Sequence, residues 1–220
     1  MRHVIKQGEP ASFCHWKAQA SADWEPTWAD LRAPEKPELH QALLQEQGYT
    51  CCYCGRAISA EGSHIEHFRP RSGECGYPHL SLSYRNLLAS CQRNEGQGVP
   101  LVCGRAKGGW FDEGSHVDPQ DPDCEQRFSY GSQGPIRPAA DGDAPASTMI
   151  EKLKLNADIL VETRKEVLAG AFTDEDLMAD DEVLLREIAQ CYAQRGADGQ
   201  LPSMGHVVRR WAEDHLGLSL

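Results

Sequence analysis

A cysteine knuckle constrains the fold of this chain more than any other feature. The run Cys51-Cys52-Tyr53-Cys54-Gly55 holds two thiols at a spacing that can grip one tetrahedral zinc ion, and the glycine lets backbone N–H groups approach the sulfurs. The chain has nine cysteines, an odd number, so complete pairing into disulfides is impossible. In a reducing compartment, metal binding explains such a cluster better. The sequence therefore predicts a small fold braced by zinc.

A closed zinc site needs a second pair of ligands, and Cys91 and Cys103 are the candidates. Eleven residues separate them, which is a long loop for a knuckle. Cys52 would have to ligate through a tighter, one-residue spacing, so we interpret it as a small buried hydrophobic residue. The alternative is that the candidate ligands are simply buried, inert thiols.

The length of the chain limits its architecture. With 220 residues it can bury one good core and a smaller appended piece. We expect an N-terminal wrapping segment and helix over residues 1–48, a core with inserted loops over 49–147, and a helical region over 148–220. Residues 1–20 lack a signal-peptide pattern, and no eighteen apolar residues follow one another, so a soluble, cytoplasmic protein is expected.

The charge is distributed unevenly. The formal net charge of −11 argues against a general nucleic-acid coat, because nonspecific binding needs cations that replace counterions along the phosphates. Residues 51–110 nevertheless carry seven Lys and Arg against four acids, a balance of +3, so the other 160 residues carry −14. The central segment is compatible with phosphate. The acidic remainder is either a solvated surface or the face for a basic protein partner.

Apolar periodicity predicts helices on both sides of the core, so we expect an α+β fold. The first helix should cover residues 35–47, with Gly48 as its C-terminal glycine. The segment from Tyr84 begins like a helix, and residues 111–147 are predicted to be loops because they are dense in Asp, Pro and Gly. Further helices are predicted over 149–168 with Ser147 or Thr148 as N-cap, over 173–195 with Thr173 as N-cap, and over 203–215.

Residues 64–70 (HIEHFRP) alternate apolar and polar side chains and are predicted to form a short strand ended by Pro70. Glu66 offers a hard oxygen ligand for Mg²⁺ or a similar ion, and a neutral imidazole at His67 suits proton abstraction from water. Neighbouring strand residues point to opposite faces, so Glu66 and His67 can reach one metal only where a strand end or a twist redirects their side chains. The alternative for His67 is a structural histidine.

Asn86 follows His67 by nineteen residues and is expected at a loop-to-helix entry. There its amide can hydrogen-bond the backbone and hold the preceding loop. A plain helix cap is the alternative role.

Four motifs in this order, CCYCGRAI, HIEHFRPRS, YRNLLASC and VCGRAKGG, resemble the HNH endonuclease superfamily. More narrowly, they are similar to the HNH subunit of Septu and retron-linked antiphage systems. The likeness extends to the opening MRHVIKQGEPASF and to the later DPDCEQRFSYGSQGPIRP. The resemblance implies a ββα-metal core braced by structural zinc, and metal-dependent hydrolysis of phosphodiester bonds in nucleic acid.

The resemblance also implies residue roles. His67 would be the general base, Glu66 a ligand of a catalytic Mg²⁺ or Mn²⁺ in place of the commoner aspartate, and Asn86 the residue that orients the loop and His67. The structural zinc would be bound by Cys51, Cys54, Cys91 and Cys103.

This chain departs from the family at the second metal-binding histidine, where Gly104 stands. His116 is the first candidate to replace that histidine. The other candidates are Asn94, Glu95 and Asp118.

Arg69, Arg71 and Arg85 are candidates for holding flanking phosphates, because a planar guanidinium matches phosphate geometry. So few basic residues predict weak binding by the chain alone. The resemblance implies a partner, a PtuA-like ATPase of the ABC or SMC-like type, and we expect the acidic residues 148–220 to dock it. DNA is the expected substrate. The alternatives are an RNA such as tRNA, or a zinc-braced binding module without catalysis.

Overall fold

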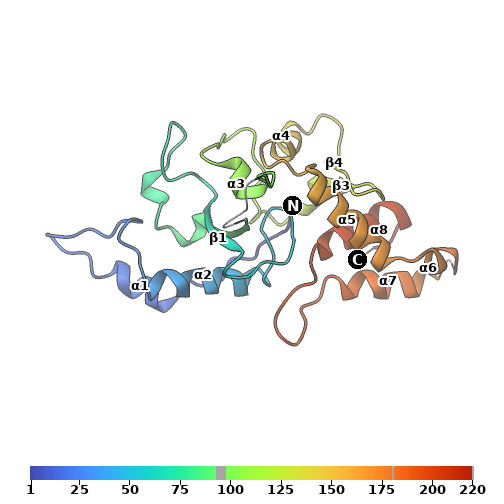
Figure 1. Ribbon diagram of the computed structural model, residues 1–220, viewed down its shortest axis with the longest axis horizontal. Coiled ribbons are helices and arrows are strands. Elements are labelled where there is room, and N and C mark those ends of the chain that lie inside the picture. The colour runs from blue at the N-terminus through green and yellow to red at the C-terminus, as the bar shows by residue number, and fades with distance from the viewer. Residues whose placement is uncertain (93–97, 180, 220) are drawn as a thin grey trace.

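The structure, a computed structural model, describes residues 1–92, 98–179 and 181–219. Short helices and two small antiparallel sheets make up this part of the chain (Figure 1), in agreement with the predicted α+β class. The helices are α1 (Ala11–Lys17), α2 (Glu35–Glu46), α3 (Cys103–Lys107), α4 (Ala144–Lys152), α5 (Asp158–Ala171), α6 (Asp174–Ala179), α7 (Glu182–Cys191) and α8 (Gly205–Leu216). The strands are β1 (Ser63–His67), β2 (Leu87–Cys91), β3 (Phe128–Tyr130) and β4 (Ile136–Pro138), and the 3₁₀ turns are η1 (Pro78–Leu80), η2 (Tyr84–Asn86) and η3 (Cys124–Arg127).

The hairpin of β1 and β2 carries the region that the sequence singled out. The strands pair antiparallel, with His64 opposite Ser90 and Glu66 opposite Leu88. Side chains alternate along a strand and opposite residues share a face, so His64 and Glu66 lie on one face of the hairpin and His67 on the other. The strand predicted over residues 64–70 is confirmed, although it covers Ser63–His67 and ends before Pro70.

Helices cover both faces of the hairpin. On one face α2 packs against the strands through Leu39, Leu43, Leu87 and Ala89, which share one buried core. On the other face α3 contacts β2. The predicted first helix is confirmed, because α2 ends at Glu46 and Gly48 adopts a left-handed φ of +60°.

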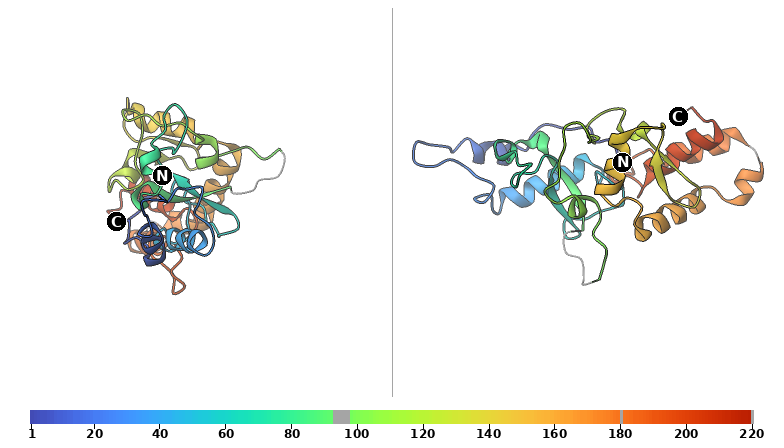
Figure 2. Two further views of the ribbon diagram at one scale, coloured as in Figure 1. Left: turned by 90° about the vertical axis from the view of Figure 1, so that its left-hand side faces the viewer. Right: turned by 90° about the horizontal axis from the view of Figure 1, so that it is seen from above.

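Two hydrophobic cores organise the residues that the structure describes. The smaller core joins α1, α2 and one face of the hairpin. The larger core joins Met1 and Val4, the cysteine knuckle and the C-terminal helices. Figure 2 shows the result as an elongated molecule, with α1 and α2 toward one end and α6 and α7 toward the other.

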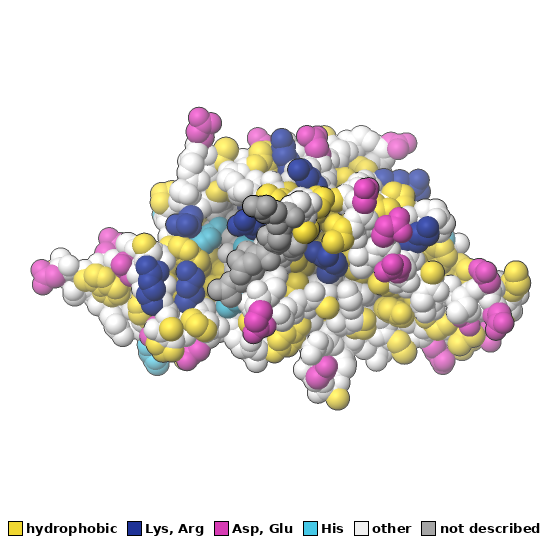
Figure 3. Space-filling view, viewed as in Figure 1, with side chains coloured by type: hydrophobic (Ala, Val, Ile, Leu, Met, Phe, Trp, Pro, Cys, Tyr) yellow, Lys and Arg dark blue, Asp and Glu magenta, His cyan; other side chains and the backbone are white. Residues whose placement is uncertain are grey.

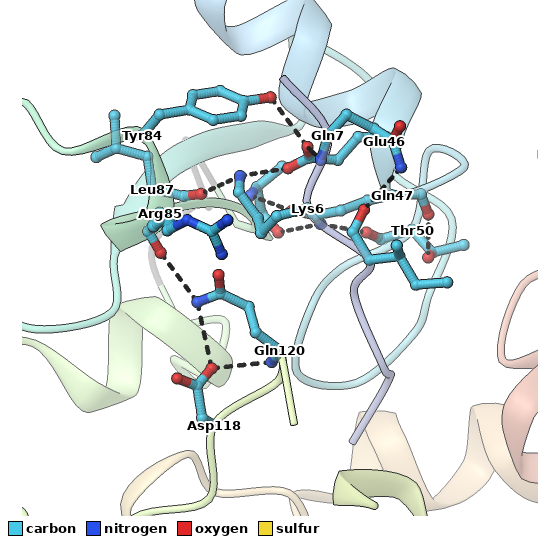
Figure 4. A network of polar contacts seen from close by, with 12 residues as sticks. Lys6, Gln7, Glu46, Gln47, Thr50, Tyr84, Arg85, Leu87, Asp118 and Gln120 are labelled. Carbon is cyan, nitrogen blue, oxygen red and sulfur yellow. Dashed lines mark hydrogen bonds and ion pairs between the residues drawn. The ribbon is translucent and has the colours of Figure 1, made fainter. Parts of the chain in front are cut away.

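A polar network fastens the first residues of the chain to α2 and β2 (Figure 4). The Lys6 ammonium donates to the Leu87 carbonyl at 2.9 Å and forms a buried ion pair with Glu46. The Gln47 amide donates to the Ala89 carbonyl at 2.9 Å and accepts from the Ala89 N–H at 2.7 Å. Because both partners on β2 are backbone groups, the network holds α2 on the strand itself.

The segment from Tyr84 is not helical, contrary to the sequence expectation. Tyr84–Asn86 forms the turn η2, and Leu87–Cys91 forms β2. Every residue of β2 is buried, since helices cover both of its faces. A strand buried on both faces loses the alternation of apolar and polar residues, so its sequence looks like a short buried helix.

The helix predicted over 149–168 is two helices. α4 ends at Lys152 and α5 begins at Asp158, with Lys154 between them at a φ of +50°. Asp143 caps α4 by accepting from the Ala146 N–H at 3.0 Å, so the predicted cap at Ser147 or Thr148 was wrong. The apolar stripe continued through the break because both helices pack on the same core.

The helix predicted over 173–195 is also divided, into α6 and α7. The Thr173 hydroxyl accepts from the Asp176 N–H at 3.2 Å, which confirms the predicted cap. α7 ends at Cys191, short of the predicted end, and α8 corresponds to the helix predicted over 203–215. Among the described helices, none is both long and apolar enough to cross a membrane.

Residues 111–147 also contain regular structure that the sequence did not reveal. β3 and β4 form a hairpin in which Tyr130 lies opposite Ile136. Strands of three residues are too short to leave a periodic signal.

Gly55 should not accept a side chain. Its φ is +72°, and a Cβ there would lie 2.3 Å from Cε1 of the buried His206. Gly142 is a matched control, because its φ is +78° and nothing lies within 4 Å of its Cβ position. We predict that Gly55→Ala lowers the free energy of unfolding by about 1–3 kcal/mol more than Gly142→Ala does, the usual cost of overpacking. Urea unfolding of both variants measures this difference, and equal losses would contradict it.

Candidate functional site

Four cysteines converge as the sequence predicted. The Sγ atoms of Cys51, Cys54, Cys91 and Cys103 all lie within 4.8 Å of one another, and all four residues are buried. Cys54 Sγ and Cys91 Sγ are 4.0 Å apart, near the separation of about 3.8 Å that bonds of ~2.3 Å impose in a tetrahedral zinc–thiolate site. In the described part of the chain this is the only group of three or more His, Cys, Asp or Glu that converges in this way.

The surroundings of the cluster favour a bound cation. Burial raises the pKa of the Cys103 thiol well above its usual range, whereas hydrogen bonds from the neighbouring thiols lower the pKa of Cys51 despite its burial. Hydrogen bonding thus stabilises one thiolate of the cluster, and further thiolates need a positive charge nearby. Burial opposes the charge of Arg56, yet Cys54 and Cys91 hold the pKa of its guanidinium above the usual value. Cys52 is fully buried and outside the group of four, as predicted. A tetrahedral ion therefore fits this donor set.

Glu66 lies on the α3 side of the hairpin, and its two oxygens have different partners. Oε1 is 2.9 Å from the Lys107 ammonium and accepts from the Tyr53 hydroxyl at 3.1 Å. Oε2 accepts from the His64 ring at 3.3 Å. Burial would raise the pKa of Glu66, but Lys107 and His64 lower it below its usual value. The carboxylate is therefore an ionised, buried oxygen donor.

His67 lies on the opposite face of β1 in a different environment. Its Nε2–H donates to the Ser81 carbonyl at 3.0 Å, so the lone pair of the neutral ring is on Nδ1. Trp28 packs edge-on against the imidazole, with the ring centroids 4.3 Å apart. Burial lowers the pKa of His67 to about 4, which leaves the ring neutral at neutral pH but reduces its basicity in this buried position.

Asn86 closes the loop that follows β1. Its Oδ1 accepts from the Arg69 N–H at 2.8 Å, and its Nδ2 donates to the carbonyls of Arg69 at 2.9 Å and Leu80 at 3.2 Å. The amide thus bridges both ends of the connection between the strands. It does so from the end of η2, at a turn-to-strand junction rather than the predicted entry to a helix.

The three predicted phosphate-binding arginines lie around this loop. Arg69 forms an ion pair with Glu113 at 3.1 Å, while Arg71 and Arg85 are exposed. A cavity of about 310 Å³ is lined by Arg69, Arg85, Asn86, Asp118 and Gln120. Figure 4 shows Gln120 between Asp118 and Arg85, where its Nε2 donates to the Arg85 carbonyl at 2.9 Å and to Asp118 Oδ1 at 3.3 Å.

The structure places His116 in an aromatic cluster. Its Nδ1–H donates to the Asp112 carbonyl at 2.9 Å, and its ring packs on Phe68 and Phe111 with centroid distances of 5.5 and 4.8 Å. Its role as a metal ligand stays a prediction. Two of the alternatives, Asn94 and Glu95, lie outside the described residues.

Sequence reasoning gave no role to Tyr53, His64 or Lys107, although all three contact Glu66. The spacing of His64 and Glu66, two residues apart on a strand, was a usable signal for a shared face. Tyr53 and Lys107 are distant in sequence and left no such signal.

The chain is similar to several curated proteins. The "Retron Vc95 putative HNH endonuclease" of Vibrio cholerae serotype O1 biovar El Tor is 32% identical over 104 residues, which is 47% of this chain and 48% of that protein. The "Retron Ec83 putative HNH endonuclease" of Escherichia coli is 26% identical over 208 residues, 76% of this chain and 79% of that protein. Septu protein PtuB of Bacillus thuringiensis is 38% identical over 99 residues, 44% of this chain and 37% of PtuB. No protein-family model matches the chain.

The chain therefore resembles HNH-type nucleases named for retrons and the Septu protein PtuB, as its motifs indicated. The matched segment spans 48% of the first relative and 37% of PtuB.

The cysteine cluster yields a test of metal content. We predict about one zinc ion per purified chain, and its loss in Cys91→Ser, because three thiolates leave a tetrahedral site open. Cys52→Ala is the matched control, since Cys52 is equally buried but outside the cluster. It should keep its zinc and lose only about 1–2 kcal/mol of stability. Elemental analysis measures the zinc content of each variant, and thermal unfolding measures its stability. Zinc retained in Cys91→Ser would refute the four-cysteine site.

Proposed function

We propose that this chain is a metal-dependent HNH endonuclease, the effector subunit of an antiphage defence complex, with DNA as the favoured substrate. The arrangement of Glu66, His67 and Asn86 supports the proposal most strongly. It combines an ionised carboxylate and a neutral imidazole on the last two residues of β1 with an amide that holds the loop that follows. Because the two side chains leave the strand on opposite faces, the substrate phosphate would lie across the end of β1 to meet both. The hairpin β1–β2 with α3 on the Glu66 face corresponds, in this proposal, to the ββα-metal core.

Two metal sites follow from this proposal. Structural zinc would be held by the four cysteines, with Arg56 offsetting part of the negative charge of a four-thiolate site. A catalytic Mg²⁺ or Mn²⁺ would be held by Glu66 and would offset charge on the phosphate and the departing 3′ oxygen.

His67 would supply the proton transfer. Its Nδ1 lone pair takes a proton from water, and the resulting hydroxide attacks the phosphorus while the bond to the 3′ oxygen breaks. The 3′ oxygen gains a proton from solvent, which leaves a 5′ phosphate and a 3′ hydroxyl. The bond from Nε2 to the Ser81 carbonyl keeps the ring in the tautomer that this step needs.

Charge near β1 supports binding of a phosphate backbone. Lys and Arg side chains gather beside histidine in this region, while acidic side chains are prominent toward the end formed by α6 and α7 (Figure 3). Arg71 and Arg85 are exposed and available to phosphates. Arg69 would first have to leave Glu113 or bind phosphate through the N–H donors that Glu113 does not use.

His67→Ala tests the function directly. We predict that it lowers cleavage by about 10²- to 10⁴-fold, the usual contribution of a general base, with unchanged folding by circular dichroism. His15→Ala is the control, because His15 is exposed on α1 and should leave activity unchanged.

The assay should use plasmid DNA and total tRNA with Mg²⁺ or Mn²⁺, with and without the ATPase partner that the resemblance implies. Cleavage of tRNA alone would replace DNA by RNA as the substrate. Cleavage of neither, or full activity in His67→Ala, would favour a binding module without this catalytic mechanism.

The acidic C-terminal part is our proposed docking face for the ATPase. Apolar side chains are exposed there, with Met178 at 83%, Val183 at 66% and Leu184 at 37% exposure. They lie on α6 and α7 among acidic residues such as Asp174, Glu175 and Glu182. Apolar residues within a charged rim are typical of a protein interface, so the partner should present a basic patch with apolar pockets.

We predict that Met178→Asp with Val183→Asp abolishes co-purification with the ATPase, because two charges would be buried without partners. Ile5→Asp is the matched control, since Ile5 is 65% exposed in the N-terminal segment. The control should bind normally, and normal binding by the double variant would place the interface elsewhere.

A further inference from the structure

We propose that His64 is the second protein ligand of the catalytic metal, supplied from β1 in place of the helix histidine that Gly104 replaces. The inference rests on the proposed function, since it completes the metal site of the same nuclease. It assigns the remaining ligand to a residue two positions before Glu66 rather than to His116.

The two donor atoms are already at a ligating distance. His64 Nε2 and Glu66 Oε2 are 3.3 Å apart on the same face of β1. Adjacent ligands at bonds of about 2.1 Å are separated by about 3.0 Å around an octahedral ion and about 3.4 Å around a tetrahedral one. The observed separation needs little rearrangement to admit an ion between them.

The carboxylate presents one oxygen for this purpose. Lys107 and Tyr53 contact Oε1 and thereby fix the orientation of the Glu66 carboxylate. The other oxygen, Oε2, contacts His64 and is the one that would bind the metal. The Lys107 ammonium already offsets part of the negative charge of the carboxylate. A metal ion on Oε2 therefore needs a further donor, which the His64 imidazole supplies.

The imidazole is not bonded as a structural histidine would be. Its Nδ1 is buried and has no hydrogen-bond partner. Buried polar atoms are normally satisfied, so an unpartnered ring nitrogen beside a carboxylate needs an explanation. Without a cation, Nε2 must carry the proton to approach Oε2. With a cation between them, Nε2 coordinates through its lone pair and Nδ1 carries the proton.

The Glu66 and His64 side chains fill the space that a side chain on Gly104 would need. A Cβ at this position would lie 2.4 Å from Glu66 Oε2 and 2.9 Å from His64 Nε2. A histidine on α3 and His64 on β1 would therefore compete for the same space beside the carboxylate. The lack of a side chain at Gly104 is therefore what allows His64 to lie against the carboxylate.

The site has a route to solvent. The His64 side chain is 22% exposed and lines a cavity of about 520 Å³ that also contacts Trp28, Arg32 and Lys36. An ion and a substrate phosphate can reach His64 from this cavity, and its two cationic residues favour an anionic substrate there.

Mn²⁺ binding to the zinc-loaded full chain tests the assignment. Electron paramagnetic resonance measures affinity from the loss of the free Mn²⁺ signal, and pulsed measurements detect a coordinated nitrogen, assigned by ¹⁵N-histidine labelling. We expect imidazole coupling in the wild type and its loss in His64→Ala and His64→Gln. In both variants the Mn²⁺ affinity should fall at least about 100-fold, since even outer-shell changes cost ~10- to 100-fold. Zinc content should not change.

His116→Ala is the control that separates the two candidate histidines, and it should keep the coupling. Coupling that survives in both His64 variants, or disappears in His116→Ala, overturns the proposal. Absence of Mn²⁺ binding in the wild type also overturns it and leaves Lys107 as the sole cation on Glu66.

Cleavage measured in parallel keeps the two proposals apart. If the chain cuts nucleic acid but shows no His64-dependent coupling, the nuclease proposal stands and the assignment of His64 as a ligand fails. A chain with His64-dependent coupling and no cleavage, with or without the partner, retains the ligand but not the nuclease.

Discussion

The convergence of four sulfur atoms is the constraint on which the rest of the site depends. It joins the knuckle at Cys51 and Cys54 to the end of β2 at Cys91 and the start of α3 at Cys103. A helix of five residues cannot be stable by itself, so α3 depends on this anchor and on packing for its place. Once anchored, it carries Lys107 to the Glu66 carboxylate and presents the backbone of Gly104 to the same face.

A second constraint is the alternation of side chains along β1. Glu66 and His67 are neighbours in sequence but point to opposite faces, and each face gives a different electrostatic environment. Lys107 and His64 keep the carboxylate ionised despite its burial, whereas burial beside Trp28 keeps His67 neutral. A fixed anion and a neutral base are thus produced within two residues, without a change of backbone conformation. The proposed division between metal binding and proton transfer follows from this arrangement.

Local patterns revealed much of the molecule before its structure. The knuckle spacing, the HNH-like motifs, the first helix and the short strand containing His67 were all recognisable, because each depends on residues close in sequence. The errors came where tertiary packing replaced the local signal. β2 was mistaken for a helix because both of its faces are buried, and the breaks at Lys154 and between α6 and α7 were hidden by apolar residues on either side.

The sequence by itself determined the donor set: four cysteines, a carboxylate beside an imidazole, and an asparagine to hold the loop. Only the tertiary structure decided how Glu66 is partnered, because its contacts to Tyr53 and Lys107 join segments that are far apart in the chain. It likewise brought His64 and Gly104 to the same carboxylate oxygen. The spacing of His64 and Glu66 indicates their shared face, but no spacing encodes the approach of Gly104, since it results from packing a short helix against that face of the hairpin.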